Sequence, residues 1–126
     1  MSLRTPLGRV RGLGSAKQGT HHWWVQRITA VALVPLTLWF IFSMAALAGA
    51  DAAAAAQFVA QPVNAILLLL LIAATFHHLQ LGLQVVIEDY ITGEFAKIAS
   101  LVVVKLLAVA FGVAAAFSVL KTAFGG

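Results

Sequence analysis

The sequence predicts an all-α membrane protein with three transmembrane helices. Of its 126 residues, 62% are hydrophobic and only 10% are charged, whereas a soluble domain carries roughly 25% charged residues. Charged residues divide the chain into three long apolar stretches, and each matches the roughly 20 residues that a helix needs to cross a bilayer. The apolar side chains are therefore expected to face lipid or partner subunits.

A single domain is expected over residues 1–126, with an N-terminal arm over 1–22 and helices over about 23–50, 62–90 and 97–122. Trp23 and Trp24 at the start of the first helix fit the aromatic belt of a membrane interface. Pro62 marks the start of the second helix, because proline is tolerated in a helix's first turn. Only Lys105 interrupts the third apolar stretch, and its long side chain is expected to snorkel to the interface.

Three smaller features refine these elements. The alanine run after Asp51 is compatible with a short interfacial helix. Pro35 is expected to bend the first helix. Gly112 and Ala116 form a pair of small residues one turn apart, which is suited to close helix packing in the third.

The distribution of basic residues predicts the orientation in the membrane. Five of the eight basic residues precede the first apolar stretch, namely Arg4, Arg9, Arg11, Lys17 and Arg27. The loop over residues 51–61 carries none. Because short cytoplasmic loops retain Lys and Arg, the N-terminus is expected to be cytoplasmic. The net charge of +4 is therefore interpreted as an orientation signal, and no nucleic-acid partner is expected.

The absence of cysteine excludes several chemistries. The chain has no disulfide framework, no thiolate ligand for zinc or an iron–sulfur cluster, and no covalent attachment of a c-type haem. Any metal held by this chain must be bound by His, Asp or Glu.

The paired His77 and His78 lie deep in the second apolar stretch. Ionisable groups in a membrane helix are costly and usually face a bundle interior, a cofactor or an ion path. The alternative is an interhelical hydrogen bond. At about 100° per residue, Gly82 and Asp89 lie within about 40° of His78, whereas His77 points about 100° away. Only one histidine is therefore expected to point to the helix face with Gly82, where the missing side chain leaves room for a planar macrocycle.

A six-coordinate haem at His78 would need its other ligand from a different polypeptide. His21 and His22 precede the first apolar stretch, so no other span of this chain offers a histidine. The three helices are therefore expected to form part of a heteromeric helical bundle.

Two further groups are candidates at the cytoplasmic end. Asp89 and Tyr90 lie about 16 Å from His78 along the helix axis, where a carboxylate and a phenol can hydrogen-bond a quinone and relay protons. Acidic helix ends and interfacial tyrosines are also common without such a role. Arg27 can pair with haem propionates or simply snorkel.

Taken in order, these residues resemble the small hydrophobic membrane-anchor subunits of succinate dehydrogenase, or complex II. The resemblance rests on the segment HLQLGLQVVIEDY, residues 78–90, which is similar to the family signature HxxxGxxxxxxDY, and on QRITA at the start of the first span. The three-helix layout extends it over nearly the whole chain. The N-terminal arm is Arg-rich and acid-free, as mitochondrial transit peptides are, but it lacks the pattern of a cleavable presequence, so a multi-pass location in a bacterial inner membrane is expected.

The resemblance implies roles for individual residues. His78 resembles the axial ligand of haem b, whose opposite ligand comes from the cytochrome b556 subunit. Tyr90 and Asp89 resemble residues of the ubiquinone site, and Arg27 resembles an arginine near the haem propionates and the quinone. The flavoprotein subunit would oxidise succinate, and the iron–sulfur subunit would pass its electrons to ubiquinone. This chain would then be a non-catalytic electron-transfer and anchor subunit of the enzyme, serving the tricarboxylic acid cycle and the respiratory chain.

Two other functions are compatible with the sequence. One is a cofactor-free structural anchor, in which the histidines only join helices. The other is a small proton-coupled transporter that uses His77 or His78 as its relay.

Overall fold

The computed structural model describes residues 6–7 and 17–125 of the chain. Four labelled helices follow one another, α2 (Lys17–Leu47), α3 (Ala52–Ala60), α4 (Pro62–Tyr90) and α5 (Glu94–Ala123). Three of them, over Gly19–Leu47, Pro62–Tyr90 and Glu94–Ala123, are long and apolar enough to cross a membrane. The prediction of an all-α chain with three candidate membrane helices is confirmed.

The helix ends differ from the expected ends where polar residues continue a helix. α2 begins at Lys17 instead of near residue 23, since extending a helix that has already formed is favourable. α5 begins at Glu94. A carboxylate in the first turn stabilises a helix, because its negative charge interacts favourably with the helix dipole. Apart from residues 6–7, the rest of the expected N-terminal arm lies outside the described residues, and Arg4, Arg9 and Arg11 fall in that part.

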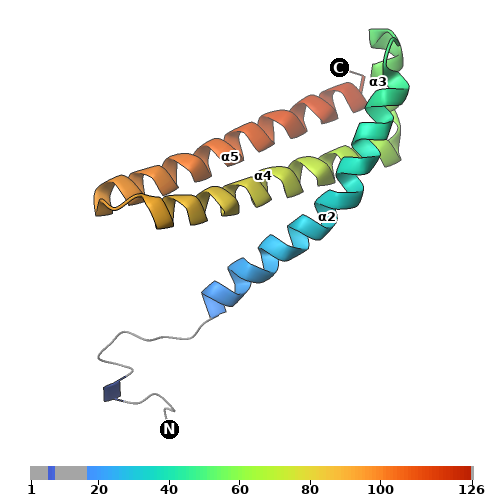
Figure 1. Cartoon of the computed structure of the whole chain (residues 1–126). Helices are drawn as coiled ribbons and strands as arrows, with labels where there is room; N and C mark the ends of the chain where they lie inside the picture. Colours follow the sequence, from blue (N-terminus) through green and yellow to red (C-terminus); the bar gives the residue numbers. More distant parts are fainter. Residues whose placement is uncertain (1–5, 8–16, 126) are drawn as a thin grey trace.

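The alanine run after Asp51 forms the short helix α3. The Asp51 side chain accepts a hydrogen bond of 2.9 Å from the Ala54 amide and caps this helix. Trp39 of α2 stacks on Phe58 of α3, with ring centroids 5.9 Å apart. α3 therefore closes one end of the bundle, beside the C-terminal end of α5 (Figure 1).

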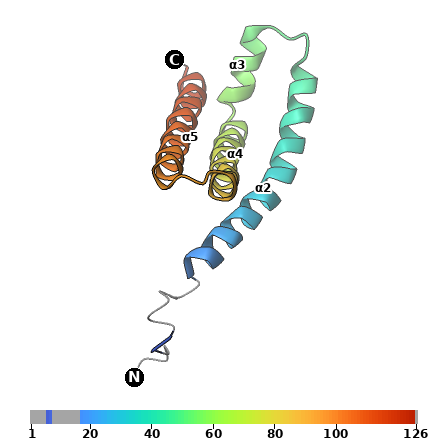
Figure 2. The same ribbon diagram turned by 60° about the vertical axis from the view of Figure 1, so that its left-hand side comes forward.

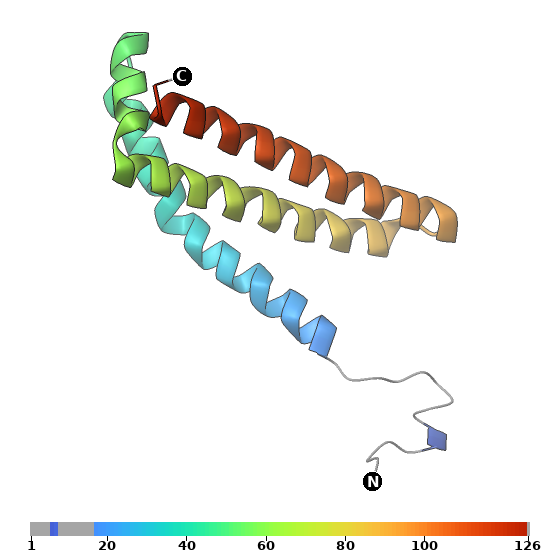
Figure 3. The same ribbon diagram turned by 180° about the vertical axis from the view of Figure 1, so that it is seen from behind.

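α4 is the central helix. α4 and α5 run antiparallel beside each other, while α2 crosses α4 obliquely and its N-terminal turns diverge from the α4–α5 pair (Figures 1 and 3). Viewed nearly along α4 and α5, α2 is the outlying helix (Figure 2). The buried core of the described chain consists of Ala65, Leu68, Leu81 and Ile87, all of which belong to α4.

Most other apolar side chains are exposed. Val31 and Phe42 of α2 are each 72% exposed, and Val113 of α5 is 63% exposed. Burying apolar surface is the main favourable term in folding and association, and this chain buries little of it internally. Lipid and partner subunits are the surroundings that suit such a surface.

Candidate functional site

His78 lies at the crossing of α2 and α4. Its Nδ1 atom lies 3.0 Å from the Thr29 hydroxyl of α2, and its side chain is half-buried. The ring makes no other hydrogen bond among the described residues. Its Nε2 atom therefore has no partner there, and it is not fully buried. One ring nitrogen is therefore held by α2, while the other remains available to a ligand.

Gly82 lies one turn from His78 and also faces α2. The Nε2 atom of Gln26 is 3.8 Å from the position that a Cβ on Gly82 would occupy. The Gln26 amide oxygen is buried without a hydrogen-bond partner in the described part of the chain. We call His78, Gly82, Val85 and Asp89 the His78 face. It begins at the contact with α2 and continues onto exposed surface at Val85 and Asp89.

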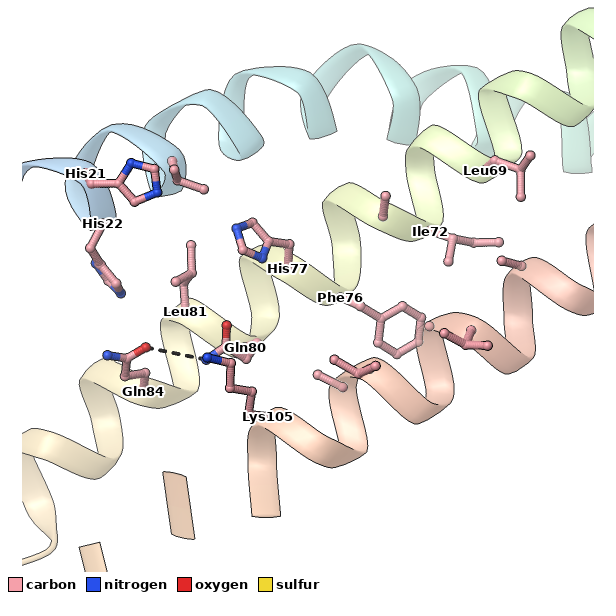
Figure 4. A pocket seen from close by; sticks show the side chains of 17 residues that line it. His21, His22, Leu69, Ile72, Phe76, His77, Gln80, Leu81, Gln84 and Lys105 are labelled. Carbon is pink, nitrogen blue, oxygen red and sulfur yellow. Dashed lines mark hydrogen bonds between the residues drawn. The ribbon is translucent and has the colours of Figure 1, made fainter. Parts of the chain in front are cut away.

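His77 lies on a different side of α4 and lines a groove of about 920 Å³ between α2, α4 and α5 (Figure 4). Most of the groove wall is apolar. Its polar side chains are His21, His22, His77, Gln80, Gln84 and Lys105. His78, Gly82 and Asp89 do not line it, so the two adjacent histidines have separate environments.

A row of polar side chains follows the groove side of α4. Gln80 donates a hydrogen bond of 3.4 Å to Gln84, and Gln84 donates one of 3.1 Å to Glu88. These residues are four positions apart, so they lie on one helix face. Lys105 of α5 is exposed at the same groove, where it can reach this polar row as well as snorkel.

Gly112 of α5 packs against α4 further along. A Cβ placed on Gly112 would lie 3.6 Å from three atoms of the Phe76 side chain. This close approach agrees with the packing role expected for Gly112, which lines the groove together with Ala116.

Arg27 is exposed on α2, and its guanidinium carbon lies 5.3 Å from the centroid of the Trp23 ring. A cation over an indole face at an exposed site contributes about 0.5–1 kcal/mol. Arg27 does not line the groove. At about 100° per residue it lies about 120° or more from each groove-lining residue of α2. It also lies about 160° from Thr29 and about 100° from Gln26, the two α2 residues that face α4, so its side chain begins on the side of α2 that points away from α4.

Asp89 and Tyr90 form the end of α4. Tyr90 is its last residue and is 81% exposed, and Asp89 is exposed beside it. Gln26 lies beside Gly82, so Arg27 is about 12 Å from Tyr90 along the helix axis. The structure thus brings Arg27 near the level of His78 but does not bring it to Tyr90.

Two partners were not predicted from the sequence, Thr29 at His78 and Gln26 at Gly82. Both residues belong to the QRITA segment that opens the first span. Their spacing of three residues places them on one face of α2, and this spacing is the sequence feature that could have indicated a shared contact. Pairing that face with α4 required the crossing geometry of the two helices.

Comparisons with known proteins agree on one family. The model of the succinate dehydrogenase/fumarate reductase transmembrane subunit family matches residues 1–120. A succinate dehydrogenase hydrophobic membrane anchor subunit of Rickettsia bellii is 36% identical over 107 residues, covering 85% of this chain and 86% of that protein. One of Paracoccus denitrificans is 32% identical and covers 79% and 77%.

A succinate dehydrogenase membrane anchor subunit of Reclinomonas americana is 29% identical over 96 residues, covering 74% of this chain and 80% of that protein. No solved structure matches the chain significantly.

Proposed function

Because this chain belongs to the succinate dehydrogenase/fumarate reductase transmembrane subunit family, we propose that its His78 is one axial ligand of a b-type haem. We further propose that Asp89 and Tyr90 form part of a ubiquinone site at the end of α4. The chain is a multi-pass membrane anchor subunit of succinate dehydrogenase. Its proposed partners are the cytochrome b556, iron–sulfur and flavoprotein subunits.

The observation that carries the haem proposal is the environment of His78. Histidines that bind a metal almost always donate their other ring N–H to an oxygen, and Nδ1 of His78 has such an oxygen at 3.0 Å. No group of three or more His, Asp or Glu side chains gathers in the described part of the chain. A single axial nitrogen is thus what this site offers, and the opposite ligand is expected from the cytochrome b556 subunit.

The remaining residues of the proposed site have distinct tasks. A bound b-type haem supplies a one-electron redox centre within the membrane. Arg27 offers a guanidinium group that can bind carboxylates in bidentate geometry. The Trp23 ring packs against this group and restricts its position. The exposed hydroxyl of Tyr90 can donate to a quinone carbonyl, and Asp89 can deliver a proton there.

A second candidate function is a cofactor-free structural anchor. The contact between Thr29 and His78 joins α2 to α4, which is also what an interhelical hydrogen bond would do. Membership in this family favours either anchor over the proton-coupled transporter.

The variant His78→Asn separates these two functions. An asparagine amide can still hydrogen-bond the Thr29 hydroxyl but is not a haem ligand. We expect the four-subunit complex that carries this variant to assemble in mild detergent and to lose most of its haem. The measurement is the reduced-minus-oxidised spectrum, normalised to flavin. His77→Asn is the matched control, because His77 lies at the groove, and it should keep the haem.

Full haem content in the His78→Asn complex would contradict the ligand assignment. A wild-type complex that is free of haem and still reduces quinone would support the structural anchor instead.

A further inference from the structure

The Thr29 hydroxyl contacts three polar atoms at once. It lies 2.8 Å from the Val25 carbonyl oxygen, 3.0 Å from the Gln26 carbonyl oxygen and 3.0 Å from Nδ1 of His78. A hydroxyl carries one hydrogen and two acceptor lone pairs. It can therefore donate either to a carbonyl of its own helix or to His78, but not fully to both.

The two arrangements impose opposite tautomers on His78. If Thr29 donates to Nδ1, that nitrogen is an acceptor, and a neutral ring carries its proton on Nε2. If Thr29 donates to the carbonyls of Val25 or Gln26, its oxygen accepts a proton from Nδ1–H, and Nε2 keeps its lone pair. Only the second arrangement leaves a metal-binding nitrogen on His78 while every contact is satisfied.

We propose that Thr29 is a positioning residue that selects the Nδ1–H tautomer of His78 and sets the electron donation of Nε2 toward iron. The chain of hydrogen bonds runs from Nδ1–H of His78 to the Thr29 oxygen, and from the Thr29 hydroxyl to the backbone of α2. This inference rests on the proposed role of His78 as a haem ligand. It assigns a function to Thr29 that neither the family membership nor the haem proposal contains.

The site favours this arrangement for two reasons. The carbonyl oxygens lie within α2, at positions three and four residues before Thr29, so the helix itself fixes the acceptors of the threonine hydroxyl. Helix α2 also holds the hydroxyl against the half-buried His78 ring. The imidazole is therefore restricted both in its tautomer and in its rotation about the side-chain bonds.

A hydrogen bond donated by Nδ1–H raises the basicity of the opposite nitrogen. A more basic ligand stabilises ferric iron relative to ferrous iron and so lowers the haem midpoint potential. Removing the acceptor should therefore shift the potential to more positive values. Loss of such an outer partner typically weakens metal binding roughly 10- to 100-fold, and haem retention should weaken in the same range.

The test compares Thr29→Val with Thr29→Ser in the complete four-subunit complex. Valine keeps the shape of threonine but removes the acceptor, while serine keeps the hydroxyl. Thr37→Val is the matched control, since Thr37 is an exposed threonine on the same helix. The readouts are the haem midpoint potential by redox titration, the electron paramagnetic resonance spectrum of the oxidised haem, and the haem-to-flavin ratio.

We expect Thr29→Val to raise the midpoint potential, to alter the resonance spectrum and to lose haem more readily in detergent. Thr29→Ser and Thr37→Val should match the wild type. A Thr29→Val complex without haem, beside a Thr29→Ser complex that retains it, would also support the role of the hydroxyl.

An unchanged potential and spectrum in Thr29→Val would overturn the role of Thr29, as would a Thr29→Ser complex as impaired as Thr29→Val. The His78→Asn complex distinguishes this failure from failure of the proposed function. If His78→Asn loses its haem but Thr29→Val is normal, only the tautomer proposal falls. If His78→Asn keeps its haem, the ligand assignment itself falls.

Discussion

The Nε2 atom of Gln26 lies 3.8 Å from the position that a Cβ on Gly82 would occupy. That separation is ordinary van der Waals contact, so a methyl group fits beside Gln26 without displacing α2. Gly82 is half-buried and lies one turn from His78. The internal packing of this chain therefore does not require a glycine at this position, and the close approach of a bound group is the proposal that the next prediction tests.

Substitution of Gly82 should separate folding from haem binding. Alanine in place of a helix-interior glycine favours the helix by up to about 1 kcal/mol, so we expect Gly82→Ala to assemble normally. Gly82→Leu should lower the haem-to-flavin ratio more strongly than Gly82→Ala, because its longer side chain extends over the His78 face. Gly112→Ala is the control, since its Cβ would meet Phe76 at 3.6 Å, away from that face. Full haem content in Gly82→Leu would contradict close approach of haem at Gly82.

Tyr90→Phe should impair quinone reduction selectively. The Tyr90 side chain is 81% exposed at the end of α4, so removing its hydroxyl leaves the fold of this chain intact. Loss of one hydrogen bond of about 1.5 kcal/mol corresponds to roughly a tenfold drop in quinone reductase activity. Succinate oxidation with a soluble acceptor should be unchanged. Phe95→Leu, which alters an exposed aromatic residue at the start of α5, should affect neither assay, and equal losses in both assays for Tyr90→Phe would count against a quinone contact.

Arg27→Gln should shift the haem midpoint potential in the opposite direction to Thr29→Val. A nearby positive charge stabilises the reduced haem, which carries one more electron, so removing that charge should lower the potential. Arg27→Lys keeps the charge but loses the bidentate fork, and we expect an intermediate shift. Redox titration of the purified complexes measures the midpoint potentials of both variants. Trp23→Phe keeps an aromatic ring beside Arg27 and should stay near the wild type, whereas an unchanged potential in Arg27→Gln would place the propionates elsewhere.

Much of the fold follows from local sequence features. Pro62 stands at the first position of α4, where its missing N–H is not needed, and Asp51 caps α3 through the Ala54 amide. The three apolar stretches reach the length of a membrane helix. α2 begins at Lys17, before the expected start near residue 23, because the polar residues between them, Gly19 included, continue the helix.

The candidate site was only partly predictable. The angle of about 100° between successive residues separates His77 from His78, and the structure assigns them to the groove and to the α2 contact respectively. Which histidine meets α2 could not be predicted, since helical periodicity gives the relative directions of side chains but not the direction of the neighbouring helix. The same limit concealed Gln26 and Thr29 as partners of Gly82 and His78.

Composition and residue order already specify a helical, apolar chain without cysteine, whose intramembrane polar groups concentrate on α4. These properties depend on composition and on periodicity within one segment, which residue order alone specifies. The crossing of α2 and α4 at His78, with the Thr29 hydroxyl 3.0 Å from Nδ1, is visible only in the folded chain. That contact joins two residues 49 positions apart in the chain, and it depends on how the surfaces of their two helices fit together.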